Sequence, residues 1–347
     1  MNNLFSFATS ELSQDAFICW SMNWLNDPRK PELVQMSKKL VSLFSGVENI
    51  GSVEVFRQYR NVDILLVVNK NIAVLIESKV FTSEHSNQIE RYRELIDKDI
   101  EENGVLKLKR YKNFKEEALE YEIHEIRSVY FKTGFIRPED EEINSLKDMG
   151  FVDRSDILRI VNEYKEESDI IFDYYQYLSD LDSWYETCKE NYEAGNYFEA
   201  FQDGYGQLLC IKDLFKDKIK IGDLPETDIL LTTGSSYGRP YTWAWVWDKE
   251  DLFWLGYRLD CNNDGYFLSL RLYRKCKKDE NREEILREKE EIYECMKGEL
   301  EHLLEESPLR AVLAGNRAKY NESELAKFYF KNNSISELKE HLISITR

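Results

Sequence analysis

Two acids and one lysine lie near each other in an otherwise apolar stretch of the chain: Asp63, Glu77 and Lys79. Two carboxylates can hold Mg²⁺ or Mn²⁺, which prefer hard oxygen ligands. A metal ion held in this way lowers the pKa of a bound water molecule and offsets negative charge on a phosphate during hydrolysis. A neighbouring lysine can orient or deprotonate that water, or stabilise the leaving charge. The three residues therefore suit metal-assisted hydrolysis of a phosphodiester. The alternative is that Lys79 only forms a salt bridge with one of the acids at the end of a strand.

Apolar, β-branched runs on either side of a short polar turn predict the hairpin that carries these residues. The strands are expected at 62–68 and 72–76, with residues 69–71 as the turn. If the turn has three residues, Val68 pairs with Ile72. A two-residue turn would shift the register by one and reverse the face of every side chain on one strand.

The three-residue turn brings the candidate residues together. Asp63 then lies directly opposite Glu77, and opposed residues have Cβ atoms about 4.5–5.5 Å apart on the same face. Lys79 shares the face of Glu77 because the two are separated by one residue on a strand, while Ser78 points away. Two carboxylates this close repel unless a cation lies between them or one is protonated.

The surrounding sequence predicts further helices and strands around the hairpin. Apolar residues at helical spacing predict helices at 10–25, 32–45 and 84–100, and apolar or alternating runs predict the other strands at 53–59 and 121–131. The basic stretch before residue 121 is interpreted as turn-like. The expected fold class is α/β (α+β), with a mixed central sheet flanked by helices.

Beyond residue 135 the chain becomes acidic and aromatic. Residues 136–215 are expected to form an acidic helical segment packed on the core, and residues 216–347 an α+β extension with antiparallel strands. In that extension Trp243, Trp245 and Trp247 are expected to share one face of a strand. They could stack nucleic-acid bases, but packing against a helix is the favoured interpretation.

The central motifs resemble those of the PD-(D/E)XK nuclease superfamily, which has the restriction-endonuclease-like fold. Asp63 corresponds to the metal-binding aspartate of that family, with Val62 in place of the usual proline. Glu77-Ser78-Lys79 corresponds to its (D/E)-x-K element. The resemblance covers about residues 8–132 and includes the order of the elements.

Two further motifs extend the resemblance. Gln88 and Tyr92 match the Gln-x-x-x-Tyr motif of the branch that includes lambda exonuclease and RecB-type nucleases, and both can face the site because they stand four apart on a helix. Glu11 matches the N-terminal glutamate of the fold. Each has a simpler interpretation as well. Tyr92 lies on the apolar stripe of its helix, and an acid in a first helical turn is favoured by the helix dipole.

The resemblance implies a Mg²⁺-dependent (or Mn²⁺-dependent) nuclease that hydrolyses DNA, with residues 1–135 as the nuclease core. The resemblance assigns the role of metal ligand to Asp63, Glu77 and the carbonyl of Ser78, with Glu11 as an auxiliary ligand. It makes Lys79 the catalytic lysine. It makes Gln88 and Tyr92 substrate-binding residues. RNA as the substrate is an alternative that the sequence leaves open.

The net charge of −18 affects which partners the protein can bind and which rival function is plausible. Binding of long duplex DNA usually needs a basic surface, so any such surface is local or comes from a protein partner. The rival function is a catalytically silent nuclease fold that serves as a binding subunit in a defence or repair assembly. Scattered cysteines and the lack of an apolar membrane-length run lead us to expect a cytoplasmic protein without membrane contact, and phage defence is one expected setting.

Overall fold

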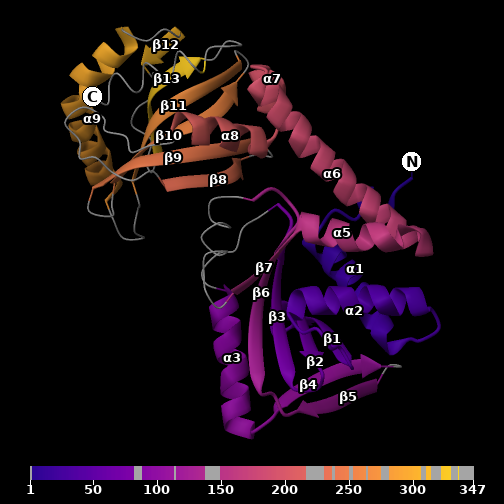
Figure 1. Ribbon diagram of the computed structural model, residues 1–347. Helices are drawn as coiled ribbons and strands as arrows, with labels where there is room; N and C mark the ends of the chain where they lie inside the picture. The colour runs from indigo at the N-terminus through magenta and orange to yellow at the C-terminus, as the bar shows by residue number, and fades with distance from the viewer. Residues whose placement is uncertain are drawn as a thin grey trace. The chain divides into compact units, whose positions relative to one another are not determined.

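The computed structural model divides the chain into two compact units, Met1–Ser183 and Trp184–Arg347, which Figure 1 shows as ribbons. The residues that it describes are 2–81, 88–112, 115–136, 149–215, 230–236, 239–249, 253–262, 265–274, 281–305, 310–313, 322–329 and 335. The sequence analysis placed divisions after residues 135 and 215, whereas the density of contacts divides the chain after Ser183. The physical basis is that residues 152–178 share a hydrophobic core with the first helices and strands.

The first unit begins with two helices, as its sequence predicts. Helix α1 (Glu11–Asn23) starts after Ser10, whose hydroxyl accepts a hydrogen bond from the Ser13 amide. Helix α2 (Pro31–Ser45) starts with proline, which suits a first turn because it lacks an amide hydrogen. It ends at Gly46, in the left-handed conformation that glycine adopts easily.

A five-stranded mixed sheet forms the centre of this unit, which confirms the expected fold class. The strand order is β1-β2-β3-β6-β7, with β1 to β3 antiparallel and β3, β6 and β7 parallel. Its strands are β1 (Val53–Tyr59), β2 (Val62–Val68), β3 (Ile72–Lys79), β6 (Glu125–Lys132) and β7 (Met149–Asp153).

The turn between β2 and β3 has three residues, as predicted. Val68 pairs with Ile72, and the antiparallel register runs from there to the pair Ile64–Ile76. Asn69 and Lys70 have positive φ angles, and the Asn69 side chain accepts hydrogen bonds from the amides of two residues before β1. The register that aligns Asp63 with Glu77 is therefore built into this turn.

Two strand predictions were incomplete. The basic stretch interpreted as turn-like is a hairpin of β4 (Leu106–Lys112) and β5 (Lys115–Tyr121). Its leucines alternate with basic residues and enter a buried cluster. Strand β7 lies in a region that was expected to be helical, and it adds a fifth strand parallel to β6.

Helices and the hairpin cover the two faces of the central sheet. One face packs against α1, α2, α5 (Arg154–Tyr164) and the first part of α6 (Asp169–Glu193). The other face packs against α3 (Gln88–Asn103) and the β4–β5 hairpin (Figure 1). Side chains at the end of β3 therefore point alternately toward α1 and toward α3.

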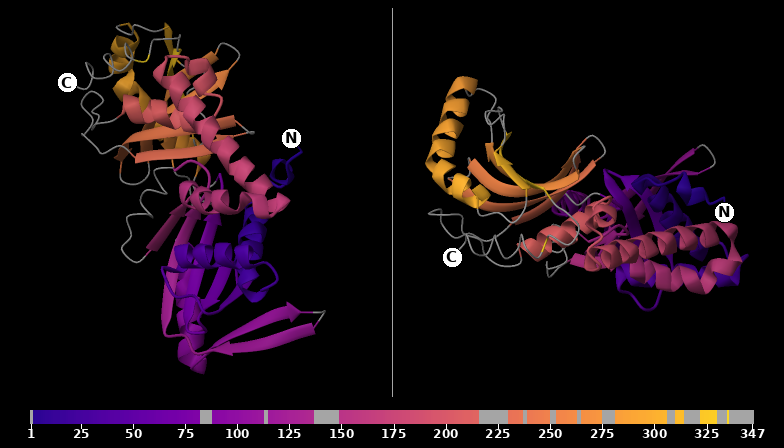
Figure 2. Two further views of the ribbon diagram at one scale, coloured as in Figure 1. Left: turned by 45° about the vertical axis from the view of Figure 1, so that its right-hand side comes forward. Right: turned by 90° about the horizontal axis from the view of Figure 1, so that it is seen from above.

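The second unit contains a six-stranded antiparallel sheet with the order β12-β13-β11-β10-β9-β8. Figure 2 shows that its strands are curved. Its elements are the end of α6, α7 (Tyr197–Ala200), α8 (Gly204–Leu214), β8 (Leu230–Ser236), β9 (Arg239–Lys249), β10 (Phe253–Asn262), β11 (Gly265–Arg274), α9 (Arg282–Glu305), β12 (Arg310–Leu313) and β13 (Glu322–Tyr329). Residues of α8 and α9 share one hydrophobic cluster with one face of this sheet. In the described parts of the chain, no helix is long and apolar enough to cross a bilayer.

Candidate nuclease site

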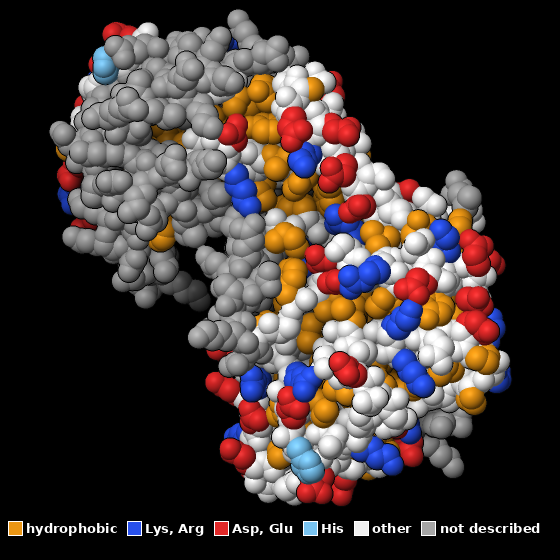
Figure 3. Space-filling view, viewed as in Figure 1, with side chains coloured by type: hydrophobic (Ala, Val, Ile, Leu, Met, Phe, Trp, Pro, Cys, Tyr) orange, Lys and Arg blue, Asp and Glu red, His pale blue; other side chains and the backbone are white. Residues whose placement is uncertain are grey.

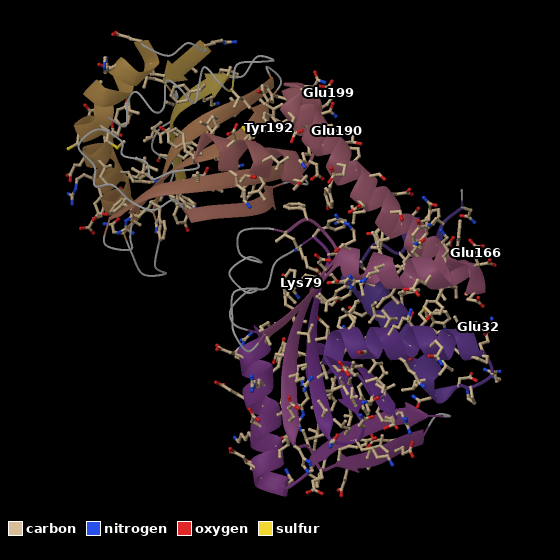
Figure 4. The ribbon with its side chains drawn as sticks, in the orientation of Figure 1. Glu32, Lys79, Glu166, Glu190, Tyr192 and Glu199 are labelled. Atoms are coloured by element: carbon tan, nitrogen blue, oxygen red, sulfur yellow. The ribbon has the colours of Figure 1, made fainter. Side chains whose placement is uncertain are left out.

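Asp63, Glu77 and Lys79 meet at the edge of the central sheet where β3 ends. The backbone amide of Ser78 donates a hydrogen bond to Asp63 Oδ2 at 2.9 Å. Lys79 Nζ donates to Glu77 Oε1 and lies 3.8 Å from Asp63 Oδ2. Figure 4 shows Lys79 at this end of the strand. The structure thus brings together the three residues that the sequence analysis singled out.

The trio is mostly withdrawn from solvent, and this sets its electrostatics. Only 3% of the Glu77 side chain and 11% of the Lys79 side chain are exposed. Burial raises the pKa of Asp63 above its usual value, although the Ser78 amide and Lys79 act in the opposite direction. Burial by itself lowers the pKa of Lys79, but Glu77 and Asp63 outweigh it and leave that pKa above its usual value. The lysine is therefore held in its charged form beside the two acids.

Glu11 approaches the same strand end from α1. Its Oε1 accepts a hydrogen bond from the backbone amide of Val80 at 3.2 Å. The contact ties the first turn of α1 to the residue that follows Lys79. Glu11 also contributes to the raised pKa of Asp63, so its carboxylate lies within the electrostatic field of the site.

Gln14 is a site residue that the sequence analysis missed. Its amide nitrogen donates to Ser78 Oγ at 2.8 Å, and its amide oxygen accepts a hydrogen bond from the Thr133 hydroxyl. The Thr133 amide donates in turn to the carbonyl of Lys79 at 3.2 Å. This buried bridge joins α1, the end of β3 and the residue after β6. Ser78 points toward α1, away from the trio, as predicted.

Asp15 is a second missed residue, and it is almost fully buried beside Ser78. The residue is 1% exposed, and its carboxylate lies close enough to the Ser78 hydroxyl for that group to stabilise the charged form. Burial raises its pKa to about 7; the negative charges of Asp63 and Glu11 add to the effect, while the Ser78 hydroxyl and Lys79 reduce it.

A signal for Asp15 exists in the sequence. Glu11 and Asp15 stand four residues apart on α1, and like charges at that spacing destabilise a helix. Such a pair on a helix that must pack against a sheet indicates a polar site rather than a solvated face. Lys132, fully buried and in register with Lys79 on β6, was also missed. The predicted strand ended one residue earlier, so the sequence analysis gave Lys132 no place in the sheet.

Tyr92 packs in the core and lies within the electrostatic field of the acids. It is 9% exposed and belongs to the cluster between α3 and the sheet. Its pKa is raised by burial and further by the nearby charges of Glu77 and Asp63. The two interpretations offered by the sequence are thus compatible in space. Gln88 lies in the first turn of α3, but its side chain is outside the described part of the structure.

The donor set near Lys79 suits a hard divalent cation. In the described residues, no group of three or more His, Cys, Asp or Glu side chains is arranged to hold a metal ion. Asp63 and Glu77 instead form a pair of carboxylates on one face, and the Lys79 ammonium rests against both of them. A site where two acids already hold one positive group has the oxygen donors and the charge to accept Mg²⁺ or Mn²⁺, with water completing the coordination.

Two basic residues of the β4–β5 hairpin pair with acids. Lys109 pairs with Glu116 at 2.7 Å, and Arg110 pairs with Glu54 and Glu117. The charges of these two side chains are therefore compensated on the hairpin surface.

Comparison with known proteins places this fold and site in a family. No curated protein and no solved structure matches the chain significantly. A family model described as the PD-(D/E)XK nuclease superfamily matches residues 2–202, which is more than half of the chain. The matched range contains the central sheet, the three residues at the end of β3 and the helix that carries Glu11. The chain therefore belongs to the PD-(D/E)XK nuclease superfamily.

Proposed function

We propose that this protein is a Mg²⁺-dependent nuclease that hydrolyses phosphodiester bonds of DNA. The observation that carries the proposal is the convergence of Asp63, Glu77 and Lys79 at one buried strand end. Intact acids and an intact lysine argue against the rival function of a catalytically silent scaffold. The residues present are also those that phosphodiester hydrolysis requires.

The carboxylates of Asp63 and Glu77 and the backbone carbonyl of Ser78 would hold the metal ion, with Glu11 as an auxiliary acid. When bound, Mg²⁺ (or Mn²⁺) supplies an activated water and offsets charge on the phosphate. We expect the metal ion to displace the Lys79 ammonium from Glu77. We assign Lys79 the role of a positively charged hydrogen-bond donor to the reacting phosphate or water, rather than of a base.

We also propose that Gln88 and Tyr92 position the substrate strand, as in the branch of the family with the Gln-x-x-x-Tyr motif. Tyr92 supports this because its ring lies near the acids while its helix packs on the sheet. Replacing Tyr92 by Phe keeps the packing and deletes only the hydroxyl. The substrate role predicts a higher KM for DNA and an unchanged thermal midpoint.

The distribution of charge favours a local nucleic-acid surface or a protein partner. On the face drawn in Figure 3, basic and acidic side chains of the described residues are interspersed. With a net charge of −18, we propose that a partner supplies basic surface for DNA. A cytoplasmic role in phage defence is the setting that we favour.

A cleavage assay tests the proposal. Purified full-length protein is incubated with linear DNA, circular DNA and RNA, in Mg²⁺, Mn²⁺ or chelator. We expect metal-dependent cleavage of DNA that falls by at least about 100-fold in Lys79→Ala. The matched control is Lys98→Ala, which removes an exposed lysine of α3 and should change nothing. Cleavage of RNA alone would correct the substrate. Equal behaviour of wild type and Lys79→Ala on every substrate would favour the binding scaffold.

A further inference from the structure

The sheet of the second unit has one face that does not belong to the hydrophobic cluster formed with α8 and α9. Within the described residues, β10 alternates between Leu255, Tyr257 and Leu259 in that cluster and Trp254, Arg258 and Asp260 outside it. The opposite face therefore carries aromatic and charged side chains, contributed by β9, β10, β11 and β13. We call this the polar-aromatic face; it includes Tyr241, Trp243, Trp245, Trp254, Arg258 and Tyr273.

Two tryptophans on this face form a flat stack. The rings of Trp243 and Trp245 are 4.2 Å apart and inclined by 6°. Neither is a member of the hydrophobic cluster that the described residues of α8 and α9 form with the sheet. A register shift between β9 and β10 pairs Trp245 with Gly256 but Trp247 with Leu255. The simple alternation that was expected to continue to Trp247 is therefore broken, and the side chain of Trp247 lies outside the described residues.

Gly256 makes room for the Trp245 ring. A Cβ atom at position 256 would lie 2.8 Å from Trp245 Cε3 and 2.8 Å from the carbonyl oxygen of Ala244. Real Cβ atoms do not make contacts this short. Any residue larger than glycine at position 256 would therefore collide with the indole of Trp245. The ring consequently lies close against the backbone of β10.

Trp254 and Tyr273 stand beside this ring. They pair directly across β10 and β11, and each meets Trp245 edge-on, at 5.8 Å and 5.9 Å between ring centroids. All three rings are partly exposed. A planar aromatic ligand such as a nucleobase can stack on rings of this kind.

A charge-balanced network borders the aromatic rings. Arg258 lies 4.4 Å from the centroid of Tyr241 and pairs with Asp260 at 2.9 Å. The network continues through Arg271, Glu322, Glu324 and Lys327. Among the described residues, three basic and three acidic side chains thus offer donors and acceptors side by side, in equal numbers. Arg258 Nε is buried and meets no acceptor among the described residues.

We propose that this polar-aromatic face binds an unpaired base of a single-stranded nucleic acid. Aromatic rings supply the stacking surface, while Arg258 and its acidic neighbours supply hydrogen-bonding groups for the edge of the base. The equal numbers of basic and acidic side chains in the described network favour a base over a phosphate, because phosphate binding requires uncompensated basic groups. This inference rests on the proposed function, since it takes the ligand to be nucleic acid.

Binding to matched oligonucleotides tests the proposal. The protein is full length, carries Asp63→Asn to prevent cleavage, and is kept in chelator. Fluorescence anisotropy then compares a labelled 12-nucleotide single strand, the same strand with abasic positions, and the blunt duplex. We expect the single strand to bind at least about tenfold more tightly than the abasic strand and the duplex. Equal affinity for the three, or no binding to any, would overturn the proposal.

Variants connect binding to the named residues. Trp245→Leu and Tyr273→Leu should each weaken binding of the single strand by about fivefold or more, while Trp184→Leu, which removes an exposed tryptophan of α6, should leave it unchanged. Thermal melting separates lost binding from lost folding, and Tyr273→Leu serves where Trp245→Leu does not fold. Unchanged affinity in a folded variant would overturn the assignment. Base-dependent binding by a protein that cuts no nucleic acid would refute the proposed nuclease function and leave this site standing.

Discussion

The backbone amide of Ser78 donates a hydrogen bond to Asp63 Oδ2 at 2.9 Å, so the acid on β2 is fixed against the strand that carries Glu77 and Lys79. This contact is the consequence of the three-residue turn at the other end of the hairpin. It holds a candidate metal ligand in place when no metal is bound. The same contact makes it possible to remove the charge of Asp63 without removing the hydrogen bond.

Asp63→Asn should abolish metal-dependent cleavage but preserve the fold. The asparagine oxygen still accepts from the Ser78 amide, while the charged metal ligand is lost. Because burial raises the pKa of Asp63, the charged form is disfavoured in the folded state, and we expect a thermal midpoint in chelator no lower than that of wild type. Cleavage should fall by at least about 100-fold. Asp97→Asn, on the exposed side of α3, is the control; wild-type cleavage by Asp63→Asn would contradict the assignment.

Asp15 should make the stability of the protein depend on pH. Its pKa is about 7 in the folded protein, against an ordinary value of 3.8. Between these values the folded state binds one more proton than the unfolded state, so the free energy of unfolding should fall as pH rises from about 4 to 7. The difference corresponds to at most about 4 kcal/mol. Asp15→Asn should lose this dependence and be more stable than wild type at pH 8, as measured by urea unfolding in chelator. A wild-type pH profile that Asp15→Asn leaves intact would refute the prediction.

Gln14→Leu should affect both stability and turnover, because its amide bridges Ser78 and Thr133. Leucine fills similar space but removes the partner of the Thr133 hydroxyl and one partner of the Ser78 hydroxyl, which typically costs about 1–3 kcal/mol. Since the bridge positions the end of β3, we expect kcat to fall more than KM changes. Gln176→Leu is the matched control, because that glutamine bonds to Asp180 on the surface of α6. If both variants unfold and cleave alike, the bridge has no positioning role.

Much of the first unit was predictable because local signals agree with the tertiary structure. The Asn69-Lys70-Asn71 turn sets the hairpin register, and Ser10 caps α1. The β4–β5 hairpin was missed because charged residues between its leucines resemble a basic loop, although their two-residue period is typical of a strand covered on one face. Its acidic partners on β5 and β1 become visible only when the strands pair.

Asp15 and Gln14 were missed for a different reason. Both lie on the face of α1 that packs against the end of β3. The spacing of Glu11 and Asp15 indicates a polar site, but only the packing of the helix on the sheet shows that Gln14 and Asp15 are buried in it. In the second unit, the register shift at Trp245 depends on the partner strand β10. The sequence of a single strand cannot show this register shift. The expected face of the tryptophans could therefore be tested only once the pairing of the strands was known.

Manganese binding tests the central claim most directly. Crystals of the full-length protein grown with saturating Mn²⁺ are measured for anomalous scattering. We expect a peak in contact with the carboxylates of Asp63 and Glu77, with the Lys79 ammonium displaced from Glu77. No peak at these carboxylates, with Lys79 still bonded to Glu77, would contradict it.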